Sequence, residues 1–146
     1  MKTSFAITLL FFFAMKLSAQ EAGAVEVNSN APKFKFETES IDYGTLKHNA
    51  NGSREFKFTN VGKEPLIIIS VPTGCGCLIS TYPKEPIKPG ESGVIKATYD
   101  THRVGRFEKT MIVNSNADRP QVSLKIKGIV LPPKNDSTAI TFPSPK

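Results

Sequence analysis

Residues 122–127 spell Val-Ser-Leu-Lys-Ile-Lys, in which every second side chain is apolar. Because successive side chains of a β-strand point to opposite faces, this alternation predicts a strand with one buried and one solvated face. Val122, Leu124 and Ile126 should face a core, and the serine and lysines between them should face water. Such a strand is typical of an antiparallel sheet that is covered on one side only.

Similar short runs precede this strand, and turn residues such as Asn, Gly, Pro and Asp separate them. No stretch shows the apolar period of an amphipathic helix. Short strands with regular turn signals between them are typical of a sandwich. The sequence therefore predicts an all-β, seven-stranded antiparallel β-sandwich, with strands at residues 34–45, 54–59, 66–71, 78–82, 94–99, 107–113 and 122–127.

Two of the early strands carry specific expectations. Phe56 and Phe58 should point into the core, because polar residues alternate with them, and Asn51-Gly52 should form the preceding turn. Residues 66–71 are almost all apolar and do not alternate. This run predicts a strand that is buried on both faces or lies close to the centre of the sandwich.

The N-terminal segment has the composition of an export signal. A positive residue, Lys2, precedes an apolar run at residues 5–15, and Leu17-Ser18-Ala19 supplies the small residues of a cleavage site. The apolar run is too short to span a membrane. The expected organisation is a signal peptide at 1–19, a flexible N-terminal tether at 20–32, the β-sandwich domain at 33–130 and a proline-rich flexible tail at 131–146.

The net charge of the 146-residue chain is modest. The chain has 19 basic and 13 acidic residues, and removal of Lys2 and Lys16 with the signal peptide lowers the net charge from +6 to +4. No cluster interleaves basic with aromatic residues, so we expect no nucleic-acid partner. Gln20 follows the cleavage site, which leaves no cysteine there for lipid attachment. We expect an exported protein, periplasmic or secreted, without a transmembrane anchor.

A series of short motifs resembles a bacterial secreted family known as domain of unknown function 1573. The resemblance covers residues 34–130 and implies an immunoglobulin-like sandwich, similar to domains of cilium-associated and sperm-protein-like families, with no known activity. The motifs are Tyr43-Gly44, Phe56-x-Phe-Thr-Asn60-Val-Gly62, Cys75-Gly76-Cys77, Lys88-Pro89-Gly90-Glu91, Tyr99-Asp100-Thr101, Gly105-x-Phe107, Asn114-Ser-Asn116 and Ile126-x-Gly128.

The Cys75-Gly76-Cys77 motif has three interpretations. A disulfide suits an exported protein, but a bond across one residue closes a small ring and should be readily reduced, which would make the pair redox-active. Two thiolates on the same side of an extended chain would suit a soft metal such as Cu(I) or Zn²⁺. The third interpretation is structural: a tight turn, with or without a disulfide, whose small cysteines pack under the next strand.

Two histidines extend the metal hypothesis. If seven strands run alternately up and down, the connections that hold His48, the cysteine pair and His102 lie at one pole of the sandwich. Two thiolates and two imidazoles would then complete a tetrahedral site, provided that these loops converge. Cys75, Cys77, His48 and His102 are therefore the candidate metal ligands, while no other cofactor is expected.

Catalysis has little support in the sequence. Asp42, Asp100 and the glutamates are spread over turns and outward-facing strand positions, so no carboxylate pair or Ser/His/Asp set is indicated. We expect a non-enzymatic, exported immunoglobulin-like binding or scaffold module of the bacterial envelope, with a protein partner. The alternative is a thiol-redox or soft-metal handling protein that uses the Cys75-Gly76-Cys77 motif.

Overall fold

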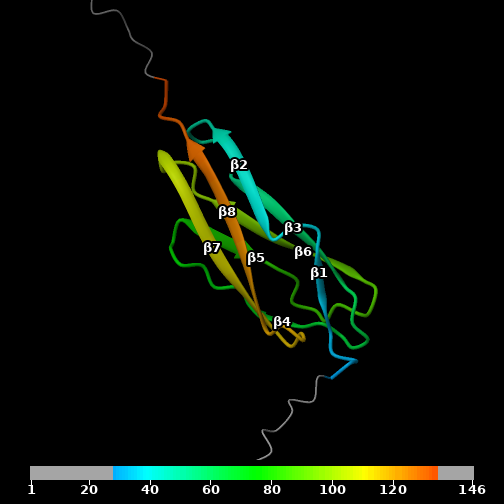
Figure 1. Cartoon of the computed structure of the whole chain (residues 1–146). Helices are drawn as coiled ribbons and strands as arrows, with labels where there is room; N and C mark the ends of the chain where they lie inside the picture. The colour runs from blue at the N-terminus through cyan, green and yellow to red at the C-terminus, as the bar shows by residue number, and fades with distance from the viewer. Residues whose placement is uncertain (1–27, 135–146) are drawn as a thin grey trace, which may run out of the picture.

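The computed structural model describes residues 28–134. The expected signal peptide at 1–19, the first part of the tether and the tail beyond residue 134 lie outside the described residues. The described part consists of two four-stranded sheets packed face to face (Figure 1). Its strands are β1 (Phe34–Phe36), β2 (Ser40–Leu46), β3 (Ser53–Asn60), β4 (Ile68–Ser70), β5 (Leu78–Thr81), β6 (Ser92–Tyr99), β7 (Gly105–Ser115) and β8 (Gln121–Val130).

The strand order is that of an immunoglobulin-like sandwich. One sheet has the order β1-β3-β6-β5 and the other has the order β2-β8-β7-β4. Leaving β2 aside, this is the arrangement of a constant-type immunoglobulin domain, in which strands A, B, E and D face strands C, F and G. The prediction of an all-β immunoglobulin-like sandwich is confirmed.

The structure has eight strands rather than seven, because the expected first strand at 34–45 is divided. β1 pairs antiparallel with β3, and after a short crossing β2 pairs with β8 in the opposite sheet, where the two strands are parallel. A turn closed by the Thr38 hydroxyl, which donates to the Ser40 carbonyl at 2.7 Å, separates them. The inward positions change from even (Phe34, Phe36) to odd (Ile41, Tyr43) across this crossing, a break in the alternation that the sequence analysis missed.

The prediction for residues 66–71 is wrong. Only Ile68–Ser70 forms a strand, β4, and it lies at the edge of its sheet with a register shift between Ile68 and Ser70. Leu66, Ile68 and Val71 are buried, whereas Ile67 is 42% and Ile69 is 65% exposed. The run alternates in space although its composition does not, because the outward positions also carry isoleucine.

The core follows the predicted faces elsewhere. Phe56 and Phe58 are fully buried on β3, and Leu124 and Ile126 are fully buried on β8. Between the sheets the rings of Tyr99 and Phe107 stack with centroids 3.8 Å apart. This ring stack ties the end of β6 to the start of β7 across the sandwich.

The chain enters and leaves the described domain at opposite ends (Figure 1). We call residues 28–33, 60–65 and 87–91 the N-terminal pole, and residues 47–52, 100–104 and 131–134 the C-terminal pole. The last residues of the expected tether are held at the N-terminal pole, where the Pro32 carbonyl accepts a hydrogen bond from the Asp118 amide at 2.9 Å. No helix of residues 28–134 has the length and apolarity needed to cross a bilayer.

The turn before β3 lies slightly earlier than expected. The Ala50 amide donates to the Lys47 carbonyl, and Asn49 has a positive φ of 61°. Gly52 instead allows the backbones of residues 52 and 99 to come close together. Its carbonyl accepts a hydrogen bond from the Tyr99 amide at 2.9 Å, and a Cβ at this position would collide with the Tyr99 carbonyl. The glycine therefore lets β3 and β6 meet at the C-terminal pole.

Candidate functional site

A loop between β4 and β5 carries the cysteines from one sheet to the other. Cys75 and Cys77 form a disulfide with Cα atoms 5.2 Å apart. Cys77 is 4% exposed and packs in the core, whereas Cys75 is half-buried. The two sulfurs of the predicted site are thus joined to each other, and one of them lies nearer to the solvent.

Hydrogen bonds fix this loop at both ends. The Ser80 hydroxyl donates to the Val71 carbonyl at 2.6 Å, and Thr73 forms a β-bridge with Met111 of β7. The Asp100 amide donates to the Cys77 carbonyl at 2.9 Å. The backbone of the cysteine loop is therefore anchored to both sheets and to the C-terminal pole independently of the disulfide.

The two histidines meet at the C-terminal pole. The rings of His48 and His102 lie edge to face, with centroids 5.6 Å apart. The Asp100 carboxylate accepts a hydrogen bond from the His102 amide, and this bond is the main cause that lowers the pKa of Asp100. The side chains of His102 and Arg103 lower this pKa further. The loops of both histidines thus converge as expected, with the Cys77 backbone beside them.

This convergence does not by itself form a metal site. Among residues 28–134, no three His, Cys, Asp or Glu side chains lie close enough together to hold a metal ion. The four-ligand site of Cys75, Cys77, His48 and His102 therefore stays a prediction.

The other motif residues have evident structural roles. Asn60 is fully buried, and its side chain accepts hydrogen bonds from the amides of Lys33 and Gly62 and donates to the carbonyls of Glu64 and Ile87. This one side chain joins the three segments of the N-terminal pole. The sequence motif drew attention to Asn60, but the residue pattern alone did not predict this role.

The side chains of Asn116 and Tyr43 also hold backbone segments in place through hydrogen bonds. Asn116 accepts from the Ile67 amide and donates to the Pro65 carbonyl, which positions the segment that leads into β4. The Tyr43 hydroxyl donates to the Ala97 carbonyl at 3.2 Å across the core, and burial raises the pKa of Tyr43 to about 12 against the opposing effect of Arg54.

The glycines beside the cysteines differ from the other motif glycines. Gly44 and Gly105 have positive φ values, and Gly62 and Gly128 are crowded by neighbouring atoms. At Gly74 and Gly76, by contrast, φ lies outside the left-handed region and a Cβ would meet no atom within 4 Å. Within the described structure, neither of these two positions requires glycine.

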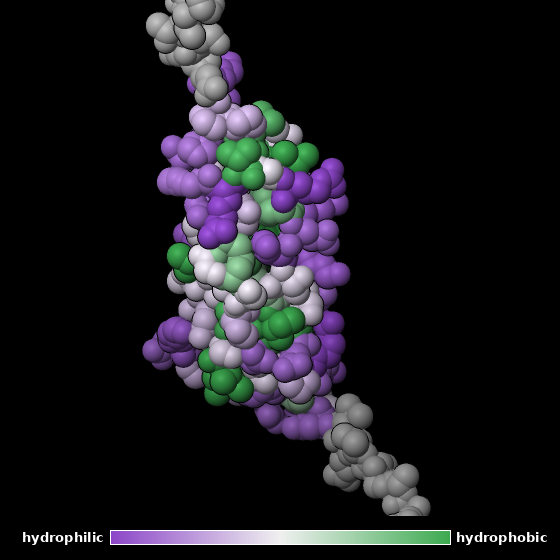
Figure 2. Space-filling view, turned by 90° about the vertical axis from the view of Figure 1, so that its left-hand side faces the viewer, coloured by the Kyte–Doolittle hydropathy of each residue, from purple (hydrophilic) through white to green (hydrophobic). Residues whose placement is uncertain are grey.

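The edge strands β4 and β5 run along one side of the sandwich, which we call the β4–β5 side. Ile69 of β4 is 65% exposed and Ile79 of β5 is 64% exposed. The Tyr82 hydroxyl, which donates to the Ile69 carbonyl, links the two edges. Figure 2 shows apolar patches between hydrophilic side chains along the face seen there. The sequence analysis missed this feature, because Leu78 and Ile79 are both apolar and their order does not show which of them faces outward.

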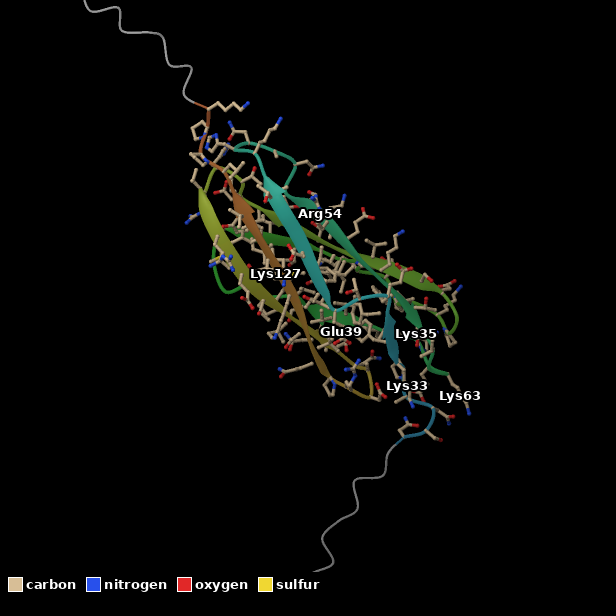
Figure 3. All side chains as sticks on the ribbon, turned by 45° about the horizontal axis from the view of Figure 1, so that its top comes forward. Lys33, Lys35, Glu39, Arg54, Lys63 and Lys127 are labelled. Atoms are coloured by element: carbon tan, nitrogen blue, oxygen red, sulfur yellow. A yellow bond between two sulfur atoms is a disulfide. The ribbon has the colours of Figure 1, made fainter. Side chains whose placement is uncertain are left out.

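The remaining surface of residues 28–134 also carries exposed apolar side chains, such as Val61, Val104 and Leu131, and it contains hollows. A pocket of about 240 Å³ lies over sheet β2-β8-β7-β4 between Asp42, Arg106 and Lys127, and one of about 410 Å³ lies between 47–49 and 131–134. The backbone amide of Gly44, together with Lys127 and Arg106, lowers the pKa of exposed Asp42. Figure 3 shows the labelled charged side chains spread over strands and loops. Lys127 pairs with Asp42, and Lys33 pairs with Asp118.

Comparisons with known structures agree with this fold. A protein of unknown function from Porphyromonas gingivalis W83 superposes with a TM-score of 0.60 at 20% identity, over 69% of this chain and 48% of that one. The chain thus spans about half of that structure. PapD-like domain 7 of human CEP192 superposes with a TM-score of 0.61 at 9% identity, over 79% of this chain and 96% of that one.

A third structure, the CsuC-CsuE chaperone-tip adhesion subunit pre-assembly complex of Acinetobacter baumannii, has a TM-score of 0.51 at 14% identity, over 68% of this chain and 52% of that one. The search of curated proteins found no match. A family model described as "Protein of unknown function (DUF1573)" matches residues 34–130. The chain therefore belongs to the DUF1573 family, as the motifs predicted.

Proposed function

We propose that the protein is an exported, non-enzymatic binding module of the bacterial envelope that receives a protein partner along its β4–β5 side. The observation that carries this proposal is the exposure of Ile69 and Ile79 on the edge strands of the two sheets, β4 and β5. Exposed apolar side chains beside open sheet edges are features of surfaces that bind other chains.

Three of the four sheet edges are less suited to strand addition than β5. β1 and β4 have three residues each, and register shifts interrupt β2 between Asp42 and Thr45 and β4 between Ile68 and Ser70. Short strands and bulges of this kind protect an edge against pairing. β5 pairs with β6 in an unbroken register, so its free edge is regular enough to accept a strand by β-augmentation.

The structural neighbours support the class of function. The Acinetobacter baumannii structure is a complex between a chaperone and a tip adhesion subunit, and its fold is similar to the present one. Because the identity is 14%, this likeness concerns the fold alone. That the partner of the present chain is an envelope protein is part of our proposal.

A capture experiment tests the proposal. The mature chain, immobilised, is exposed to soluble envelope extract, and the captured proteins are identified by mass spectrometry. We expect Ile69→Ser/Ile79→Ser to reduce capture at least about tenfold, because truncation of apolar anchors dominates interface energies. Val61→Ser is the matched control, since Val61 is 51% exposed at the N-terminal pole. Equal capture by both variants would exclude the β4–β5 side, and the absence of any specific capture would exclude the binding function.

A further inference from the structure

The Cys75–Cys77 disulfide has no evident role in holding the described fold. The cysteine loop is anchored by the Ser80 hydroxyl, by the bridge of Thr73 with Met111 and by the Asp100 amide. A cross-link between residues separated by one position removes little entropy from the unfolded chain, because the loop that it closes is very short. The fold should therefore persist when this bond is broken.

The surroundings of the disulfide are open on one side. Gly74 and Gly76 are exposed, and no atom of the described chain would contact a side chain at either position. Their lack of side chains leaves the approach to the loop free. A partner backbone could thus come close to the disulfide, which is a frequent reason for glycine at a position with ordinary φ.

The two cysteine residues differ in exposure. Cys75 is half-buried, whereas Cys77 is 4% exposed within the core. An incoming thiolate can reach the Cys75 sulfur more easily, and the Cys77 sulfur is then the leaving group. Access and the identity of the attacked sulfur are two of the determinants of thiol–disulfide exchange.

We propose that the Cys75–Cys77 disulfide is a thiol-exchange site that accepts two electrons from a pair of cysteine thiols in another protein. In the first step a partner thiolate attacks the Cys75 sulfur, the Cys75–Cys77 bond breaks, and its electron pair leaves on Cys77, which takes a proton from water. The second partner thiolate then attacks the partner sulfur of the mixed disulfide and releases Cys75 as a thiolate, which also takes a proton from water. The partner ends with a disulfide and this chain ends with two thiols.

Electron transfer to the folded chain is the primary test. The chain, purified without reductant, is mixed with a reduced peptide that contains two cysteines, and both products are followed by mass spectrometry and circular dichroism. We expect one peptide disulfide to form for each reduced chain, with the spectrum of the folded state unchanged. The rate should lie within about tenfold of that for a disulfide-bonded peptide of residues 73–78.

A rate more than about a hundredfold below that of the peptide, or transfer only in denaturant, would show an inaccessible structural disulfide and overturn the proposal. The Cys75→Ser/Cys77→Ser variant should accept no electrons from the peptide, and it supplies the baseline rate of peptide oxidation.

Two single variants test which sulfur is attacked. Cys77→Ser leaves a thiol at Cys75, and Cys75→Ser leaves one at Cys77, so each can be reacted with glutathione disulfide. We expect the Cys75 thiol to form its mixed disulfide at least about tenfold faster, because it is the more accessible sulfur. Equal rates, or a faster reaction at Cys77, would contradict the assigned direction of attack. This test and the capture experiment are independent, since the capture variants leave both cysteines in place.

Discussion

At the scale of single residues, buried polar side chains determine how the poles are built. Asn60 is fully buried, yet its side chain makes four hydrogen bonds, all to backbone groups of the N-terminal pole. In the described structure no buried side-chain nitrogen or oxygen lacks a partner. Such complete pairing is what a buried amide requires to avoid a net cost.

Removal of the Asn60 amide should therefore be severe. In Asn60→Ala the amides of Lys33 and Gly62 and the carbonyl of Glu64 lose the Asn60 side chain as a partner, whereas the Ile87 carbonyl still accepts from the Leu66 amide, and each buried unpaired group costs about 1 to 3 kcal/mol. We expect urea unfolding to show a loss of at least about 3 kcal/mol. Asn28→Ala is the control, because Asn28 is exposed and both of its side-chain bonds, to Glu64 at 3.4 Å and from the Asn30 amide at 3.0 Å, are exposed to solvent. A loss below about 1 kcal/mol for Asn60→Ala would contradict this role.

Tyr43 should make stability depend on alkaline pH. Burial raises its pKa from 10.0 to about 12, so the folded state favours the neutral phenol more than the unfolded state does. The resulting stabilisation is complete below pH 10 and is lost as the pH rises towards 12. Tyr43→Phe should lose about 1 kcal/mol at neutral pH with its bond to Ala97, but its stability should fall less steeply above pH 10. Parallel pH profiles of unfolding free energy for the two proteins would refute the assignment.

At the scale of strands and loops, the glycines separate positions that the fold requires from positions that it does not. Gly52→Ala places a Cβ against the Tyr99 carbonyl between β3 and β6, and should cost about 2 kcal/mol or more. Gly74→Ala meets open space at an ordinary φ, so its stability should be unchanged or up to about 1 kcal/mol higher. Thermal or urea unfolding of both variants checks the contrast, and similar losses at the two positions would show that the cysteine loop is packed more tightly than described.

The strands that alternate cleanly were predictable from sequence for a physical reason. Apart from buried Asn60 in β3 and exposed Ile129 in β8, the buried positions of these two strands are apolar and the outer positions are polar or glycine, so the sequence itself shows which face is buried. The inward faces of Leu124 and Phe56 followed directly. The immunoglobulin-like order of the strands followed from the family motifs and not from the alternation.

Three features could not be predicted from the pattern. The change of inward parity between Phe36 and Ile41 marks a break but does not show that β2 joins the other sheet, and the outward isoleucines of 66–71 hide the edge position of β4. The β4–β5 side also escaped notice, because exposure at an edge depends on which strands are neighbours across the whole fold. For the candidate site, the sequence singled out the cysteine pair, but hydrogen-bonding of its loop and the difference in access between Cys75 and Cys77 depend on tertiary packing.

At the scale of the whole molecule, the proposed location in the envelope depends on export. Residues 1–19 have the features of a signal peptide, and we expect cleavage after Ala19. Protein expressed in a bacterial host with its native leader should be recovered from the soluble envelope or the medium, and intact-mass measurement should show a chain that begins at Gln20. A chain that retains Met1 and sediments with membranes would contradict export as a soluble module.

The central claim is that a protein partner binds along the β4–β5 side, and hydrogen–deuterium exchange tests it most directly. Exchange is measured on the mature chain alone and bound to the partner isolated by capture. A strand added at β5 pairs the backbone amides of its free edge, so we predict increased protection in residues 78–82 and 67–71, with β2 unchanged. Protection confined to β2 or to the C-terminal pole, with β5 unaffected, would contradict the account.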